Sequence, residues 1–75
     1  KVNSLSPGFV DTKLTRKNNS SQKIKEWKNK IPLNRLASTD DIAKVSYFLC
    51  NDNNYITGQD IVVDGGYTIG GFEID

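Results

Sequence analysis

The apolar run Ile61-Val62-Val63, enclosed by Asp60 and Asp64, is the feature that most restricts the fold of this chain. A short continuous run of β-branched residues is typical of a strand buried on both faces of a parallel sheet. Near the other end, Val2 to Ser6 alternates for a few positions between apolar and small polar residues and stops at Pro7-Gly8, which predicts another short strand. Parallel strands need a crossover connection, so we expect a right-handed strand–helix–strand unit.

A helix over residues 38–50 provides that crossover. Ser38 to Asp41 predicts its start, because a hydroxyl caps the helix and two carboxylates follow near the positive end of its dipole. Its expected apolar face is broad and contains Ile42, Val45 and Leu49, joined by Ala43, Phe48 and Cys50. Residues 51–54 end the helix, and Asp64 is expected to cap the turn at Gly65-Gly66.

A more basic helix is expected between the first strand and the crossover helix. Ser20 or Ser21 serves as its N-cap, it extends to Lys30, and Pro32 ends the segment. Ile24, Trp27 and Ile31 form only a narrow apolar stripe, so we expect this helix to dock weakly and to move.

Charge is concentrated in this part of the chain. The segment from Thr12 to Ile31 has seven of the ten Lys and Arg residues and a single acid, Glu26; the cations are Lys13, Arg16, Lys17, Lys23, Lys25, Lys28 and Lys30. Two interpretations are open: a solvated helix face, or a surface that attracts phosphate groups or an acidic carrier protein. Trp27 is the only aromatic residue among these cations, so the pattern does not favour nucleic acid.

Composition excludes several kinds of site. The 75 residues contain no His and one Cys, which rules out a Ser-His-Asp triad, an internal disulfide and a zinc cluster within the chain; we expect no metal site. No apolar run approaches the roughly 20 residues of a membrane span, and the composition suits a reducing cytoplasm. A two-stranded parallel sheet is not stable alone, and the chain lacks Met, so we expect it to be a truncated part of a larger sheet.

Four polar positions have competing interpretations. Arg35 is either a ligand contact or a surface ion-pair partner, and the cost of an unpaired buried arginine favours the surface. Asp60 and Asp64 could suggest acid–base chemistry, but their places at the ends of an apolar run favour flanking and turn roles. Cys50 has no basic neighbour in sequence, which favours inert packing over a reactive thiol.

Three motifs follow one another along the chain: Pro7-Gly8-Phe9-Val10-Asp11-Thr12, the stretch from Ile31 to Ala43, and Thr57-Gly58-Gln59-Asp60-Ile61-Val62-Val63-Asp64-Gly65-Gly66. In this order they resemble the last third of a short-chain dehydrogenase/reductase. Two departures are Asn34, where that family often has glycine, and Ser38-Thr39, where a residue followed by proline is common. The resemblance implies an α/β fold, the C-terminal strand–helix–strand portion of a Rossmann-like doubly wound parallel sheet.

The same resemblance divides the chain. Residues 1–75 would be the incomplete C-terminal segment of one dinucleotide-binding domain. Residues 1–12 would be a strand and cofactor loop, 13–31 a substrate lid, 38–50 a helix, and 59–66 the last strand and its turn.

The cofactor-binding residues implied by the resemblance are Pro7, Gly8, Val10 and Thr12. Pro7 and Gly8 would shape the turn, and the backbone of Val10 would meet the nicotinamide carboxamide. The hydroxyl of Thr12 would bind the carboxamide or a phosphate. Ligands of open α/β sheets do bind beyond the carboxyl ends of the strands, where this loop would lie. The cofactor would be NAD or NADP, and its binding would require an N-terminal part outside this chain.

No catalytic residue is assigned within the chain. No tyrosine is followed four residues later by lysine, and no glycine-rich phosphate loop is present. The resemblance therefore implies an NAD(P)-dependent oxidoreductase that transfers a hydride between nicotinamide and a carbonyl or alcohol substrate, inactive as an isolated chain. The substrate would be carrier-linked, as for 3-oxoacyl-carrier-protein reductases, or a sugar or polyol, possibilities that include phosphorylated compounds.

The implied assembly is a homodimer or homotetramer, with no nucleic-acid or membrane partner. The alternative is a non-catalytic relative that acts as an assembly or regulatory module. The presence or absence of Tyr-x-x-x-Lys upstream of Lys1 discriminates between the two.

Overall fold

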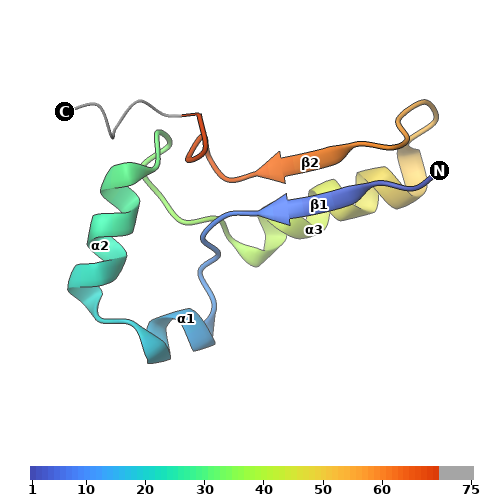
Figure 1. Cartoon of the computed structure of the whole chain (residues 1–75). Coiled ribbons are helices and arrows are strands. Elements are labelled where there is room, and N and C mark those ends of the chain that lie inside the picture. Colours follow the sequence, from blue (N-terminus) through green and yellow to red (C-terminus); the bar gives the residue numbers. More distant parts are fainter. Residues whose placement is uncertain (70–75) are drawn as a thin grey trace.

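Two parallel strands and three α-helices make up the computed structural model, which describes residues 1–69 (Figure 1). The order is β1 (Ser4–Pro7), α1 (Lys13–Asn18), α2 (Ser21–Lys30), α3 (Thr39–Tyr47) and β2 (Asp60–Val63). The strands pair in parallel with Leu5 opposite Ile61, which confirms the predicted strand–helix–strand unit. Residues 70–75 of the expected 1–75 segment lie outside the described residues.

The crossover helix α3 begins where the sequence predicts. The Ser38 hydroxyl accepts a hydrogen bond from the Asp41 amide at 3.0 Å, and the Asp41 carboxylate accepts one from the Ser38 amide at 2.8 Å, so the two residues form a capping box. The helix continues after Tyr47 into a π-helical turn over Phe48–Asp52. Asn53 ends the element, with its side-chain oxygen accepting the amides of Tyr55 and Ile56.

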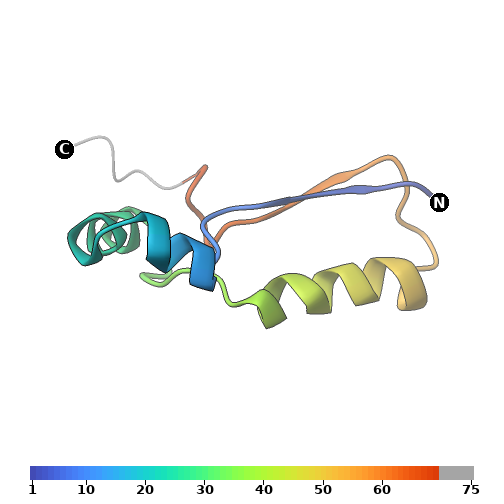
Figure 2. The same cartoon turned by 90° about the horizontal axis from the view of Figure 1, so that it is seen from below.

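The apolar face of this element is narrower than expected. Figure 2 shows α3 running along one side of the two strands. Its residues Ile42, Val45 and Leu49 are half-buried, but the other three expected members, Ala43, Phe48 and Cys50, are exposed. The prediction that Cys50 is a packing residue was therefore wrong for the described chain, because the π-helical turn sits at the end of the element and only one stripe meets the sheet.

Only one face of the sheet is covered by the described residues. Ile61 and Val63 are half-buried on the α3 side, whereas Val62 points away from it and is 48% exposed. The sequence predicted burial on both faces, and within residues 1–69 no element lies over the second face. The radius of gyration is 14.1 Å, and a compact chain of this length would have about 11 Å. The described chain is thus a flat layer with a bare sheet face.

The core lies around α2 instead. Ile24, Ile31 and Leu36 are the fully buried apolar residues of the described chain. Phe9 and Trp27 pack against them, with ring centroids 4.7 Å apart and nearly parallel. The apolar stripe of α2 is buried because the connector after α2 supplies Leu36 and the loop after β1 supplies Phe9, and the movement of this helix stays a prediction. The Ser20 hydroxyl caps α2 as predicted, accepting the Lys23 amide at 3.1 Å.

Two turns are held as the sequence suggests. The Asp64 carboxylate accepts the amides of Gly66 and Thr68, both at 2.9 Å, which confirms its role as a turn cap. The bond from the Thr68 amide is the main reason that the pKa of Asp64 is lowered. Asn34 has a φ of 59°, a left-handed conformation that glycine adopts most readily and asparagine tolerates. Asparagine therefore fits this turn in place of the glycine that the resemblance led us to expect.

Candidate functional site

The loop of residues 8–12 lies beyond the carboxyl ends of the strands. Both arrows in Figure 1 point toward the side of the molecule that contains α1 and α2. Pro7 is the last residue of β1, and the Gly8 amide extends the pairing by donating to the Val63 carbonyl at 3.0 Å. Val10 and Thr12 follow before α1 begins. The structure thus places all four sequence-predicted cofactor residues in one continuous segment at the edge where open α/β sheets bind ligands.

Gly8 is required by packing between the two strand ends. A Cβ atom at this position would lie 2.7 Å from Asp64 Cβ and 3.0 Å from Asp64 Cα. From sequence we expected the missing side chain to let a ligand approach the backbone. In the described residues the close neighbour is instead Asp64, the residue that follows β2.

The backbone amide and carbonyl of Val10 take no part in the hydrogen bonds that join this loop to Ala37. Val10 forms an isolated parallel bridge with Ala37, in which the bonds are made by its neighbours: the Asp11 amide donates to Ala37 O at 2.8 Å, and the Ala37 amide donates to Phe9 O at 2.9 Å. The amide and carbonyl of Val10 itself therefore face the opposite side. Its carbonyl accepts the Thr15 hydroxyl at 2.9 Å, and its amide has no acceptor within residues 1–69. A ligand oxygen could accept that amide.

Thr12 is the N-cap of α1, a helix that the sequence analysis missed. Its Oγ1 accepts the Thr15 amide at 3.1 Å and lies 2.9 Å from Thr15 Oγ1. Thr15 is the polar partner of this loop that sequence reasoning overlooked, since its side chain contacts both Thr12 and Val10. The signal was present, since a threonine followed by residues that tolerate a helix is a start signal, but the six-residue helix has no buried residue to reveal it.

An ion pair between exposed side chains joins the loop to α1. The guanidinium of Arg16 donates two bonds to the Asp11 carboxylate, each 2.7 Å long. The hydrogen bond from Arg16 is the main reason that the pKa of Asp11 is lowered. Of the seven cations between Thr12 and Ile31, Arg16 is therefore neutralised locally, and the lysines supply the remaining positive charge.

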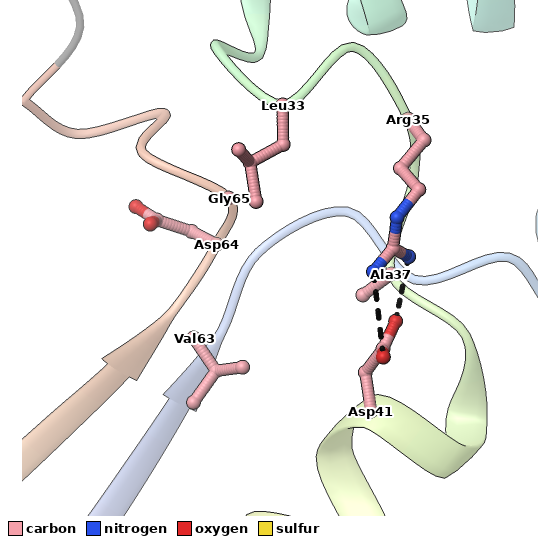
Figure 3. A pocket seen from close by; sticks show the side chains of 7 residues that line it. All are labelled: Leu33, Arg35, Ala37, Asp41, Val63, Asp64 and Gly65. Carbon is pink, nitrogen blue, oxygen red and sulfur yellow. Dashed lines mark hydrogen bonds and ion pairs between the residues drawn. The ribbon is translucent and has the colours of Figure 1, made fainter.

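A small hollow of about 200 Å³ lies beside the strand ends and is shown in Figure 3. Leu33, Ala37 and Val63 line it with apolar groups, and Arg35 closes one side by donating to Asp41 at 2.7 Å. This pair confirms the surface ion-pair interpretation of Arg35. The bond from Arg35, aided by the Ser38 amide, holds the pKa of Asp41 well below its usual range. Because Arg35 and Asp41 neutralise each other, Asp64 is the one other charged side chain among the residues that line the hollow.

Two further properties of residues 1–69 limit the possible sites. No group of three or more His, Cys, Asp or Glu side chains in this part of the chain is placed to hold a metal ion. None of the helices described is both long and apolar enough to span a membrane.

The fold defines the class: the C-terminal strand–helix–strand part of an α/β protein with a Rossmann-like parallel sheet. The sequence profile of the family described as enoyl-(acyl carrier protein) reductase matches residues 1–68. The 3-oxoacyl-[acyl-carrier-protein] reductase of Chlamydia trachomatis serovar D is 45% identical over 67 residues, which cover 88% of this chain and 27% of that protein. The chain belongs to the short-chain dehydrogenase/reductase family.

Solved structures agree with this assignment. The short-chain dehydrogenase/reductase of Brucella melitensis described as a glucose/ribitol dehydrogenase is 34% identical, with a TM-score of 0.81 over 93% of this chain and 29% of its own. ElxO with NADP bound has a TM-score of 0.81 and 37% identity, over 93% of this chain and 29% of its own. The chain thus spans about a quarter of the length of the curated relatives that it matches, and its fold is that of a Rossmann-like α/β segment of this family.

Proposed function

We propose that this segment forms the nicotinamide-facing end of an NAD(P)-dependent oxidoreductase that transfers a hydride between the cofactor and a carbonyl or alcohol carbon. The observation that carries the proposal is the Val10 amide, which has no acceptor within residues 1–69 and lies at the carboxyl edge of the parallel strands. The carboxamide oxygen of a nicotinamide is a suitable acceptor for it. Thr12, two residues later, adds a hydroxyl at the same edge.

The chemistry would come from residues outside this chain. The sequence contains neither a Tyr-x-x-x-Lys pair nor a glycine-rich phosphate loop, so the chain supplies no proton-donating tyrosine and no pyrophosphate site. What this chain would contribute is one wall of the cofactor site and, over residues 13–31, the lid above the substrate. We therefore expect the isolated 75-residue chain to have no dehydrogenase activity and no measurable affinity for NAD or NADP.

The test compares the complete enzyme with the isolated chain. Oxidation or reduction of the nicotinamide is followed by its absorbance with 3-oxoacyl thioesters, sugars and polyols as substrates, and cofactor binding is measured by calorimetry. The proposal is supported if the complete enzyme turns over substrate and the isolated chain shows neither activity nor cofactor binding. Tight cofactor binding by the isolated chain would contradict it, and a complete protein that binds no cofactor would favour the assembly or regulatory role.

The substrate class that we propose is carrier-linked or phosphorylated. Six lysines remain on the segment 13–30 after Arg16 is paired with Asp11, and Lys17 and Lys25 are among those exposed. Exposed positive charge attracts acidic partners with a strength that falls as salt rises. Replacing Lys17 and Lys25 with Glu should raise KM for a carrier-linked or phosphorylated substrate and leave KM for an uncharged analogue unchanged. Equal effects on both substrates would remove this preference.

The assembly that we propose is a homodimer or homotetramer built on the outer side of α3. Tyr47 is 64% exposed there and Phe48 is 45% exposed, which is unusual for neighbouring large apolar side chains. A second copy with the same surface would cover them by two-fold symmetry. Light scattering of the Phe48→Asp enzyme should show dissociation, whereas Lys25→Glu on the distant α2 should leave the mass unchanged. A wild-type enzyme that is monomeric at micromolar concentration would contradict the proposal.

A further inference from the structure

Three oxygen atoms at the start of α1 form a short hydrogen-bonded chain. Thr15 Oγ1 lies 2.9 Å from the Val10 carbonyl oxygen, and Thr12 Oγ1 lies 2.9 Å from Thr15 Oγ1. A hydroxyl has one proton to donate and two lone pairs to accept with, whereas a carbonyl oxygen can only accept. These limits determine which way each proton points.

The Val10 carbonyl oxygen accepts a hydrogen bond from the Thr15 hydroxyl, because a carbonyl has no proton to donate. The contact between the two hydroxyls then needs the proton of Thr12, since that of Thr15 is already in use. The oxygen of Thr12 also accepts the Thr15 amide at 3.1 Å, which uses one of its two lone pairs. Thr12 therefore has one lone pair left and no free proton.

We propose that Thr15 is a positioning residue for the nicotinamide carboxamide. Its hydroxyl donates a hydrogen bond to the Val10 carbonyl and accepts one from the Thr12 hydroxyl. The remaining lone pair of Thr12 Oγ1 can then accept a hydrogen bond from the cofactor. This inference rests on the proposed function. An acceptor suits the NH2 group of the carboxamide and does not suit a phosphate oxygen, which has no proton to give. Of the two partners that the sequence left open for Thr12, the geometry selects the carboxamide.

A purely structural role for Thr15 is separable from this one. The N-cap of α1 uses the backbone amide of Thr15, not its side chain. Replacing Thr15 with Val therefore keeps the capping bond and the β-branched shape but removes the hydroxyl. The position is half-buried, so a change of one hydroxyl leaves the surrounding contacts largely in place.

The experiment measures how well the complete enzyme distinguishes two cofactors. One is the natural nicotinamide dinucleotide, and the other is its 3-acetylpyridine analogue, in which a methyl group replaces the carboxamide NH2. The variants are Thr15→Val and Thr15→Ala, which remove the hydroxyl with different bulk, and Thr15→Ser, which restores it. Thr39→Val is the matched control, because Thr39 is exposed and its hydroxyl has no partner within residues 1–69.

We divide the KM for the 3-acetylpyridine analogue by the KM for the natural cofactor. This ratio should fall by about two- to tenfold in Thr15→Val and Thr15→Ala, because these variants lose one neutral hydrogen bond to the natural cofactor. Thr15→Ser and Thr39→Val should keep the wild-type ratio. Adding Thr15→Val to Thr12→Val should cause little further change, because the two hydroxyls act on the same contact.

Two results would overturn the inference. If both hydroxyl-free variants retain the wild-type ratio, Thr15 does not orient Thr12, while the proposed function still stands. If they raise KM equally for both cofactors, and Thr15→Ser does the same, Thr15 has only a structural role. A wild-type enzyme that binds neither cofactor would overturn the proposed function and, with it, this inference.

Discussion

Replacing Gly8 with Ala tests the packing of the two strand ends. Gly8 donates its amide to the Val63 carbonyl at 3.0 Å, and an added Cβ would lie 2.7 Å from Asp64 Cβ and 3.0 Å from Asp64 Cα. Both of these atoms belong to or adjoin the backbone, so neither can rotate away. The ends of β1 and β2 must therefore separate to make room.

The expected cost follows from these distances. Carbon atoms in contact prefer about 3.5–4.0 Å, so the shortest contact is roughly 1 Å too close. Overpacking of this kind costs about 1–3 kcal/mol, and the loss of backbone freedom in the unfolded alanine variant offsets about 0.4–1 kcal/mol. We expect a net destabilisation of about 1–2 kcal/mol, because the Gly8 backbone is not in the left-handed region and adds no strain of its own.

The assay is denaturant unfolding of the complete enzyme in a double-mutant cycle with Asp64→Gly. This second substitution removes Asp64 Cβ, the atom that an alanine at position 8 would approach most closely. In that background Gly8→Ala should cost about 1 kcal/mol less, since contacting residues are coupled. Gly58→Ala is the comparison for backbone strain alone, because Gly58 has a φ of 73° and open space around it. A Gly8→Ala variant of wild-type stability, or one whose cost is unchanged by Asp64→Gly, would refute the packing argument.

Three further predictions concern α3, the aromatic stack and the connector. Because Arg35 and the Ser38 amide lower the pKa of Asp41, its charge should stabilise the fold above about pH 4, the unfolded value, and this contribution should vanish as the pH falls through the lower folded value. Asp41→Asn should remove this part of the dependence of the unfolding free energy on pH, as measured by denaturant unfolding. Phe9→Ala should lose about 0.5–1.5 kcal/mol of ring contact and shift the emission of Trp27 to longer wavelength, and unchanged emission would contradict the stacked geometry. Asn34→Val should destabilise the fold by about 1–2 kcal/mol and Asn34→Gly should not, as measured by thermal unfolding, because glycine adopts a φ of 59° freely and valine does not. Equal stability of the two variants would contradict this prediction.

The elements that sequence predicted well are those with strong local signals. The cap residues Ser20 and Ser38 start α2 and α3 as expected, because capping depends on hydrogen bonds within a few residues. The run Ile61-Val62-Val63 forms the predicted parallel strand, and its signal is also local, because three consecutive β-branched residues favour an extended backbone. The six-residue α1 was missed, since it buries nothing and has no apolar period to detect.

Burial was harder to predict than secondary structure. Leu36 belongs to a connector that shows no periodic pattern, yet it joins Ile24 and Ile31 in the core. Conversely, Val62 lies in an apolar strand and is half exposed in the described chain. Burial depends on which distant segments meet, and sequence spacing on one element does not contain that information.

The role of Thr12 depends on the same distinction between local and distant information. Its position in the motif indicated a ligand contact, whereas its most certain role in the structure is local: it caps α1. The two roles are compatible, because the cap and the Thr15 hydroxyl together use its proton and one lone pair and leave the other lone pair for a ligand. A Thr12 variant would therefore disturb the helix and the ligand contact at once. Thr15 variants change the side-chain network and leave the capping amide intact, so they are the ones that can separate stability from cofactor recognition.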